Sequence, residues 1–145
     1  MELRDIPNKW FQREIEVPVR VRYGETDQMG VVHHINYFQY FEVARMEQFR
    51  SWGHPYGEIE KSGIRLMIID MQCKIRASAY FDEVILVKAR IHKMTRFRIV
   101  QYYEIKNKGE KFIATGRAVM VSVDMEGYPV PLPDDLYNVR EKLIG

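Results

Sequence analysis

Apolar and polar residues alternate in the first clear segment of the chain, from Glu14 to Tyr23. A two-residue period is typical of a half-buried strand, and Pro18 predicts that this strand lies at a sheet edge or carries a bulge. Gly24 and Gly30 then interrupt the pattern, so residues 24–36 are predicted to form a loop.

A period close to 3.6 residues follows between Asn36 and Trp52, and it predicts one long helix. Asn36 is expected to cap the N-terminus, with Gln39 reaching back in a capping box, and Gly53 to end the helix in a left-handed conformation. One broad face of the helix is apolar and mostly aromatic, and it consists of Tyr37, Phe38, Tyr40, Phe41, Ala44, Phe49 and Trp52. Such a face needs a large apolar partner, and a sheet is the natural one.

One cation, Arg45, falls within this apolar face. Burying a charge is costly unless the charge is paired or its head group reaches water. Glu42, or an acid from a neighbouring strand or subunit, is the expected partner, and the role of Arg45 is predicted to be structural.

Four strand-like segments follow a turn-rich stretch, with no second long helix between them, and they cover residues 64–77, 83–94, 97–105 and 111–123. The third is expected to place Phe97, Ile99, Gln101 and Tyr103 on one face. Residues 107–110 are typical of a hairpin turn, and residues 132–145 predict a short helix with Pro133 near its start.

The order of elements is therefore strand, long helix and four strands joined by short connections. Short connections favour antiparallel pairing. We expect residues 1–145 to form a single α+β domain, in which a five-stranded antiparallel sheet wraps around one long central helix and a short helix follows at the C-terminus. Two sheet edges would remain, and dimerisation is one way to cover them.

The composition is that of an ordinary soluble protein: 145 residues, of which 46% are hydrophobic and 29% charged. A formal net charge of +2 gives no reason to expect nucleic acid or a membrane surface as a partner. Cys73 is the one cysteine, so no internal disulfide is expected and a reducing compartment is indicated. Residues 1–11 lack the apolar run of a signal peptide, and no segment approaches the roughly 20 apolar residues that span a bilayer. We therefore expect a cytoplasmic protein.

The segment YGETDQMGVVHHINYFQYFEVAR, residues 23–45, resembles the signature of the hot-dog-fold acyl-CoA thioesterases, in the branch of 4-hydroxybenzoyl-CoA thioesterase and the YbgC-like proteins. The matching residues are an Asp, a Gly and an Asn-Tyr pair that opens the helix, followed by Glu-x-Ala-Arg: Asp27, Gly30, Asn36, Tyr37, Glu42, Ala44 and Arg45. A looser similarity lies in RASAYFDEV, residues 76–84, where a small-residue bend precedes Asp82.

The resemblance implies hydrolysis of an acyl-CoA thioester, or of an acyl-carrier-protein thioester, with Asp27 as nucleophile or as the general base that activates water. It also implies that the backbone N–H of His34 polarises the thioester carbonyl, and that the His34 ring assists. A helix start leaves backbone N–H groups unpaired and carries positive dipole character, which suits that role. Gly30 permits the tight turn that brings Asp27 close to this amide.

The acyl group is expected to contact residues of the loop and the first helical turns, namely Val31, Val32, His33, Tyr37 and Phe41. The aromatic residues among them are core residues first and pocket lining second. The resemblance implies no metal or organic cofactor. A metal site built from Asp27, His33 and His34 is not expected, because neighbouring histidines point apart on regular backbone and no HxH or HxxxH spacing occurs. A homodimer or a homotetramer is expected.

Plainer interpretations exist for each of these residues. An Asp in a Gly-containing loop is by default a turn residue or a cap, and Glu25 is expected to be solvated or ion-paired. The cations Lys74, Arg76, Arg96 and Arg98 either bind CoA phosphates or serve solubility. For the whole chain, the alternative is a non-catalytic hot-dog domain that binds acyl-CoA as a sensor, and a hydratase or dehydratase on the same fold is a third hypothesis.

Overall fold

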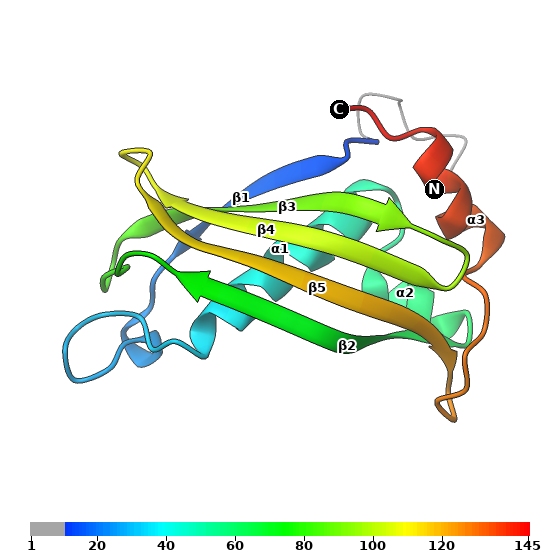
Figure 1. Ribbon diagram of the computed structural model, residues 1–145, viewed down its shortest axis with the longest axis horizontal. Coiled ribbons are helices and arrows are strands. Elements are labelled where there is room, and N and C mark those ends of the chain that lie inside the picture. Colours follow the sequence, from blue (N-terminus) through cyan, green and yellow to red (C-terminus); the bar gives the residue numbers. More distant parts are fainter. Residues whose placement is uncertain (1–10) are drawn as a thin grey trace.

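The computed structural model describes residues 11–145, which form a five-stranded antiparallel sheet with one long helix packed on its face (Figure 1). The sheet order is β1-β3-β4-β5-β2, and the strands are β1 (Glu14–Arg20), β2 (Ile64–Ile75), β3 (Val84–Met94), β4 (Arg98–Asn107) and β5 (Phe112–Asp124). The predicted α+β architecture is confirmed. The sequence prediction for residues 1–10 lies outside the described residues. Among residues 11–145, no helix has the length and apolarity needed to cross a membrane.

The two edges of the sheet are β1 and β2. Within residues 11–145, β1 pairs only with β3, and Pro18 lies opposite Leu86, so the edge position predicted from this proline is confirmed. Among the described residues, β2 pairs only with β5, and Met67, Ile69 and Ile75 are about half exposed. The second edge is thus long and partly apolar.

The long helix, α1 (Asn36–Ser51), buries one aromatic face against the sheet. Phe38 is 36% exposed, so its assignment to that face was wrong. The predicted cap was also wrong: Ile35 is the N-cap residue, and the Asn36 side chain instead donates a hydrogen bond of 2.8 Å to the Glu25 carbonyl. The end of the helix is as predicted, with Gly53 at φ +80°.

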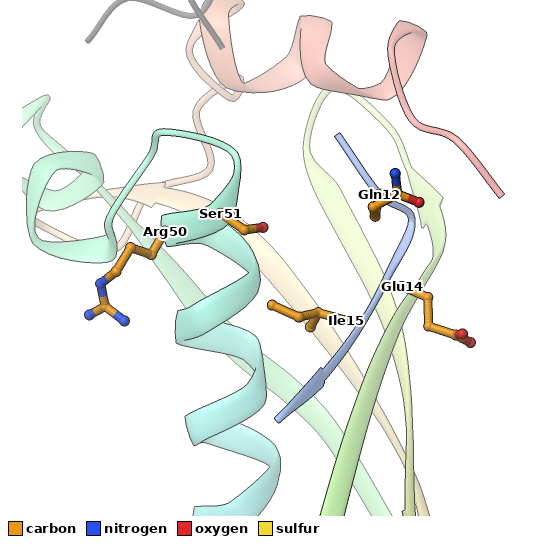
Figure 2. Close-up of a pocket in the computed structure, with 5 residues that line it drawn as sticks. All are labelled: Gln12, Glu14, Ile15, Arg50 and Ser51. Atoms are coloured by element: carbon orange, nitrogen blue, oxygen red, sulfur yellow. The ribbon is translucent and has the colours of Figure 1, made fainter. Parts of the chain in front are cut away.

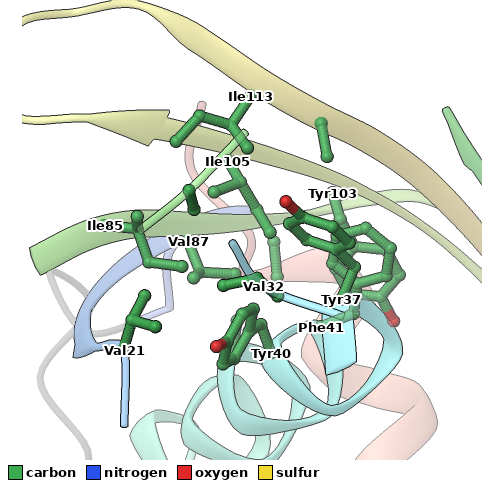
Figure 3. Packing of buried hydrophobic residues seen from close by; sticks show 14 of the residues in the cluster. Val21, Val32, Tyr37, Tyr40, Phe41, Ile85, Val87, Tyr103, Ile105 and Ile113 are labelled. Carbon is green, nitrogen blue, oxygen red and sulfur yellow. The ribbon is translucent and has the colours of Figure 1, made fainter. Parts of the chain in front are cut away.

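The helix meets the sheet at Phe41. Its ring stacks on Tyr103 of β4 with a centroid distance of 4.6 Å and lies against Gly116 of β5. A Cβ at position 116 would lie only 2.3 Å from a carbon of the Phe41 ring. Figure 3 shows Phe41 and Tyr103 within this core. A residue without a side chain is therefore needed where the ring approaches the strand.

A buried polar chain links α1 to β4. Arg45 donates to the Tyr103 hydroxyl at 3.0 Å, Tyr103 donates to Gln101 Oε1 at 2.5 Å, and Gln101 donates to Gln48. The Glu42 carboxylate lies 4.0 Å from Arg45 and is largely exposed. The expected ion pair with Glu42 is therefore present, and the Tyr103 hydroxyl adds a hydrogen bond that was not predicted.

Three further local predictions need correction. The turn-rich stretch contains a short helix, α2 (Tyr56–Lys61), and Phe97 lies outside β4 and is exposed. The C-terminal helix is broken into α3 (Asp134–Tyr137) and a 3₁₀ turn, η4 (Asn138–Glu141). Short elements such as these carry weak periodicity, so packing decides their conformation.

Candidate active site

The part of the family-like segment that precedes the helix, residues 24–35, is called the signature loop, and it folds as a tight hairpin between β1 and α1. Thr26 pairs with Val32, the Asp27 N–H donates to the Val31 carbonyl at 2.9 Å, and the Gly30 N–H donates to the Asp27 carbonyl at 3.0 Å. Gly30 has φ +79°, so the tight turn predicted from this glycine is confirmed. The turn therefore places Asp27 beside Val31, which precedes His34 by three residues in the sequence.

The second segment that resembles the family braces this hairpin. The Val32 N–H donates to the Ala79 carbonyl at 2.9 Å, and Val31 forms a bridge with Tyr80. Asp82 has φ +67° and accepts hydrogen bonds from Arg20 at both its carbonyl and its carboxylate. Asp82 thus fixes the bend beside the loop.

The Asp27 carboxylate has one oxygen in the turn and is exposed. Its Oδ1 accepts a hydrogen bond of 2.8 Å from the Met29 N–H, and Oδ2 has no hydrogen-bond partner among residues 11–145. The residue borders a pocket of about 540 Å³, which is lined by Tyr23, Thr26, Asp27, Gln28, Gly30 and Phe81. The turn holds the side chain in place while leaving one oxygen for a ligand.

A matched turn at the other end of the sheet shows what the turn alone provides. Asp124 Oδ1 accepts from the Glu126 N–H at 2.9 Å, and the Gly127 N–H donates to the Asp124 carbonyl at 3.0 Å with Gly127 at φ +93°. Asp27 and Asp124 therefore share the same Asp-x-x-Gly turn, and Asp124 Oδ1 accepts one further hydrogen bond, from the Tyr128 N–H at 3.0 Å. What distinguishes Asp27 is the pocket that it borders and its place on the loop that leads into α1.

The backbone amides that lead into α1 differ in their partners. The N–H of His33 donates to the Glu25 carbonyl at 2.9 Å, that of Ile35 to His33 Nδ1 at 3.4 Å, and that of Asn36 to the His33 carbonyl at 2.9 Å. Within residues 11–145, the N–H of His34 donates to no group, and His34 is exposed. One donor at the helix entry is therefore open to a ligand.

The two histidines do not point apart. Their rings stack with centroids 4.3 Å apart and planes 27° from parallel, so the geometric argument against a shared site was wrong. It assumed regular backbone, whereas residues 33–35 lie in an irregular turn. In the described part of the chain, no group of three or more His, Cys, Asp or Glu side chains is placed to hold a metal ion.

The residues predicted to contact the acyl group fall into two sets. Val32, Tyr37 and Phe41 are buried in the core between α1 and the sheet (Figure 3), whereas Val31 and His33 are half-buried on the loop. None of the five borders the Asp27 pocket, and their substrate contacts stay a prediction.

The pocket wall contains an aromatic pair that sequence reasoning missed. The rings of Tyr23 and Phe81 meet edge to face with centroids 5.5 Å apart, and both side chains are more than half exposed. Exposed aromatic rings beside a pocket commonly contact ligands. Both residues lie in segments that resemble the family, Tyr23 in residues 23–45 and Phe81 in residues 76–84, but nothing in the sequence shows that the two rings meet.

Sequence reasoning also missed the environment of Glu25, which is only 7% exposed. Burial by itself raises the pKa of Glu25. The hydrogen bonds from the Arg22 backbone, the Arg22 guanidinium and the Tyr40 hydroxyl lower it, and the pKa lies below its ordinary value. The predicted ion pair is present, at 2.8 Å from Arg22, but this carboxylate is buried rather than solvated.

The cations proposed for CoA phosphates lie at opposite ends of the sheet. Arg96 and Arg98 belong to the β3–β4 connection and the start of β4, whereas the signature loop follows the far end of β1 (Figure 1). Arg96 is also paired with Asp134. Lys74 and Arg76 are exposed near the loop end, where β2 finishes.

A second pocket, of about 400 Å³, lies at the C-terminal end of α1 beside the start of β1 (Figure 2). It is lined by Gln12, Glu14, Ile15, Arg50 and Ser51. None of the predicted site residues borders it. The pocket at Asp27 is therefore the candidate active site.

Comparison with known proteins agrees with this architecture. The family model of the thioesterase-like superfamily matches residues 21–139. The acyl-CoA thioester hydrolase YbgC of Escherichia coli is 27% identical over 120 residues, which are 82% of this chain and 90% of that protein. Over 84 residues the chain is 37% identical to an Aquifex aeolicus relative, and the match spans 58% of the chain and 66% of the relative.

Among solved structures, the DHNA-CoA thioesterase of Staphylococcus aureus superposes with a TM-score of 0.82 at 31% identity, covering 89% of this chain and 87% of that one. The fold and these similarities define a thioester hydrolase of the hot-dog fold. The chain belongs to the thioesterase-like superfamily, and its predicted kinship with the YbgC-like branch is confirmed.

Proposed function

We propose that this protein hydrolyses acyl-CoA thioesters to a free acid and the CoA thiol, with Asp27 and the His34 backbone amide as the reacting and stabilising groups. One observation carries the assignment. The carboxylate of Asp27 borders a pocket, and the same loop carries the backbone N–H of His34, which donates to no group among residues 11–145. The superfamily membership supports the reaction class.

In the proposed reaction, Asp27 attacks the thioester carbon or removes a proton from the water that attacks it. The carbonyl oxygen gains negative charge, and the His34 N–H donates to it. One such donor is typically worth about 10²–10³ in rate. The C–S bond then breaks, and because a thiol has a pKa of about 8.5, the thiolate leaves with little help from an acid. If Asp27 is the nucleophile, the acyl group is then bound to it as an anhydride, and water hydrolyses this anhydride to release the acid and restore the carboxylate. The Asp27 carboxylate and the His34 N–H are therefore sufficient for hydrolysis in this proposal.

We further propose that the active form is a homodimer or a homotetramer. The unpaired edge of β2 and its half-exposed Met67, Ile69 and Ile75 support an interface along that strand. Light scattering should give at least twice the chain mass of 17.3 kDa. A monomer at micromolar concentration would contradict this proposal.

The experiment that tests the function is release of free thiol from a panel of aromatic, short-chain and medium-chain acyl-CoAs, with an acyl-carrier-protein thioester beside them. Turnover of at least one substrate is expected. The sensor hypothesis predicts instead that acyl-CoA binds, as measured by calorimetry, while no thiol is released. Binding without release across the panel would exclude the proposed enzyme.

The ring of His34 is tested separately from its amide. His34→Ala removes the exposed imidazole and keeps the backbone N–H. If the amide is the stabilising group, kcat should fall by less than about tenfold, which is below the effect of losing an oxyanion donor. A fall of about 10³ would assign catalysis to the ring.

A further inference from the structure

Glu25 joins the signature loop to the start of α1. Its carboxylate accepts hydrogen bonds from the Arg22 N–H at 2.8 Å, from the Arg22 guanidinium at 2.8 and 3.1 Å, and from the Tyr40 hydroxyl at 3.0 Å. Its backbone carbonyl accepts from the His33 N–H at 2.9 Å and from the Asn36 side chain at 2.8 Å. One residue thus contacts both ends of the loop and the first turns of the helix.

A buried carboxylate needs such a set of donors. Removing an ionised group from water is expensive, and the cost is offset only when its oxygens are fully hydrogen-bonded. Tyr40 is almost completely buried in the core, where burial and the contact with Glu25 raise the pKa of its hydroxyl, so it stays protonated and donates. The Glu25–Tyr40 bond therefore attaches the loop to a rigid part of the molecule.

The two atoms proposed to act on the thioester lie on either side of this attachment. Asp27 follows Glu25 by two positions, and His34 follows His33, whose N–H is bound to the Glu25 carbonyl. A change at Glu25 should therefore move the Asp27 carboxylate relative to the His34 N–H. Catalytic geometry tolerates little displacement, since a misplacement of about 1 Å can cost about 10² in rate.

We infer that Glu25, held by Tyr40, is a positioning residue that sets the Asp27 carboxylate against the His34 backbone amide. It does not touch the substrate, because it is buried and does not border the Asp27 pocket. The inference rests on the proposed hydrolysis for its kinetic effect, although the attachment itself is a property of the free protein.

The test compares Glu25→Gln, Tyr40→Phe and the double variant with a matched control, Tyr103→Phe. Tyr103 is a buried tyrosine of β4 whose hydroxyl is also hydrogen-bonded, and it contacts Arg45 and Gln101 rather than the loop. Each tyrosine variant removes one buried hydroxyl, so both should lower the melting temperature. The two variants differ because the Tyr40 hydroxyl binds Glu25 of the loop, whereas the Tyr103 hydroxyl binds Arg45 and Gln101.

The expected result is a fall in kcat of about tenfold for Glu25→Gln and for Tyr40→Phe, with KM within about twofold of wild type. The double variant should lose less than the product of the two single losses, because both remove the same attachment. Tyr103→Phe should keep the wild-type kcat well below its melting temperature. An unchanged kcat in the first two variants, a change in KM alone, or an equal loss in Tyr103→Phe would overturn the inference.

Amide hydrogen exchange gives a readout that is independent of activity. In Glu25→Gln, and less so in Tyr40→Phe, the hydrogen-bonded amides of Asp27, Gly30 and His33 should exchange about tenfold faster than in wild type, and Tyr103→Phe should leave them unchanged. Normal exchange at these amides would overturn the attachment. Absence of turnover in the wild type would instead overturn the proposed function, and exchange would still decide whether Glu25 holds the loop.

Discussion

Asp27→Asn is expected to lower kcat for the best acyl-CoA substrate by about 10² or more while the protein stays folded. An amide is neither a nucleophile nor a base at neutral pH, so both proposed roles of the carboxylate are lost. The fold should persist because the Asn oxygen can still accept the hydrogen bond that Asp27 Oδ1 takes from the Met29 N–H. Thiol release and circular dichroism measure the two effects.

The control for this variant is Asp124→Asn. Asp124 forms the same Asp-x-x-Gly turn as Asp27, with the same side-chain bond to the residue two positions on, but it lies at the opposite end of the sheet. Asp124→Asn should keep the wild-type kcat, and its change in stability should be small, like that of Asp27→Asn. Wild-type turnover in Asp27→Asn would remove Asp27 from the chemistry, and an equal loss in Asp124→Asn would assign the effect to the turn.

Gly116→Ala should destabilise the protein by about 1–3 kcal/mol or more, the usual range for overpacking a core. The new Cβ would lie 2.3 and 2.6 Å from two carbons of the Phe41 ring and 3.0 Å from the Gln72 carbonyl oxygen. The ring cannot retreat freely because it is stacked on Tyr103. The melting temperature should fall by roughly 2–4 °C per kcal/mol.

Two further variants separate this clash from a general effect of alanine. Gly57→Ala adds a methyl group in α2 that would meet no atom within 4 Å beyond its chain neighbours and its own helix backbone, and it should be neutral or slightly stabilising. In a Phe41→Leu background, Gly116→Ala should cost less than in the wild type, because the opposing ring is gone. An equal cost in both backgrounds would show that the strand, and not the ring, excludes the methyl group.

The sequence by itself determined the elements and the turn at the site. The alternation from Glu14 to Tyr23 and the helical period from Asn36 to Trp52 are local consequences of backbone geometry, and they were sufficient to predict an edge strand and the central helix. The Asp27–Gly30 turn is also local, since one side chain and one flexible residue define it.

Tertiary structure decided which partner each polar group found. Asn36 was predicted to cap the helix, yet its side chain binds the Glu25 carbonyl, and Arg45 binds a tyrosine hydroxyl of β4 in addition to the predicted Glu42. The pocket likewise joins Tyr23 to Phe81 from two separate loops. Glu25 lies in a polar stretch of the sequence, and its carboxylate is buried where Arg22 and the distant Tyr40 donate to it. Periodicity specifies which face of an element is apolar, but the donors that permit a buried charge come from distant segments, and packing alone brings them together.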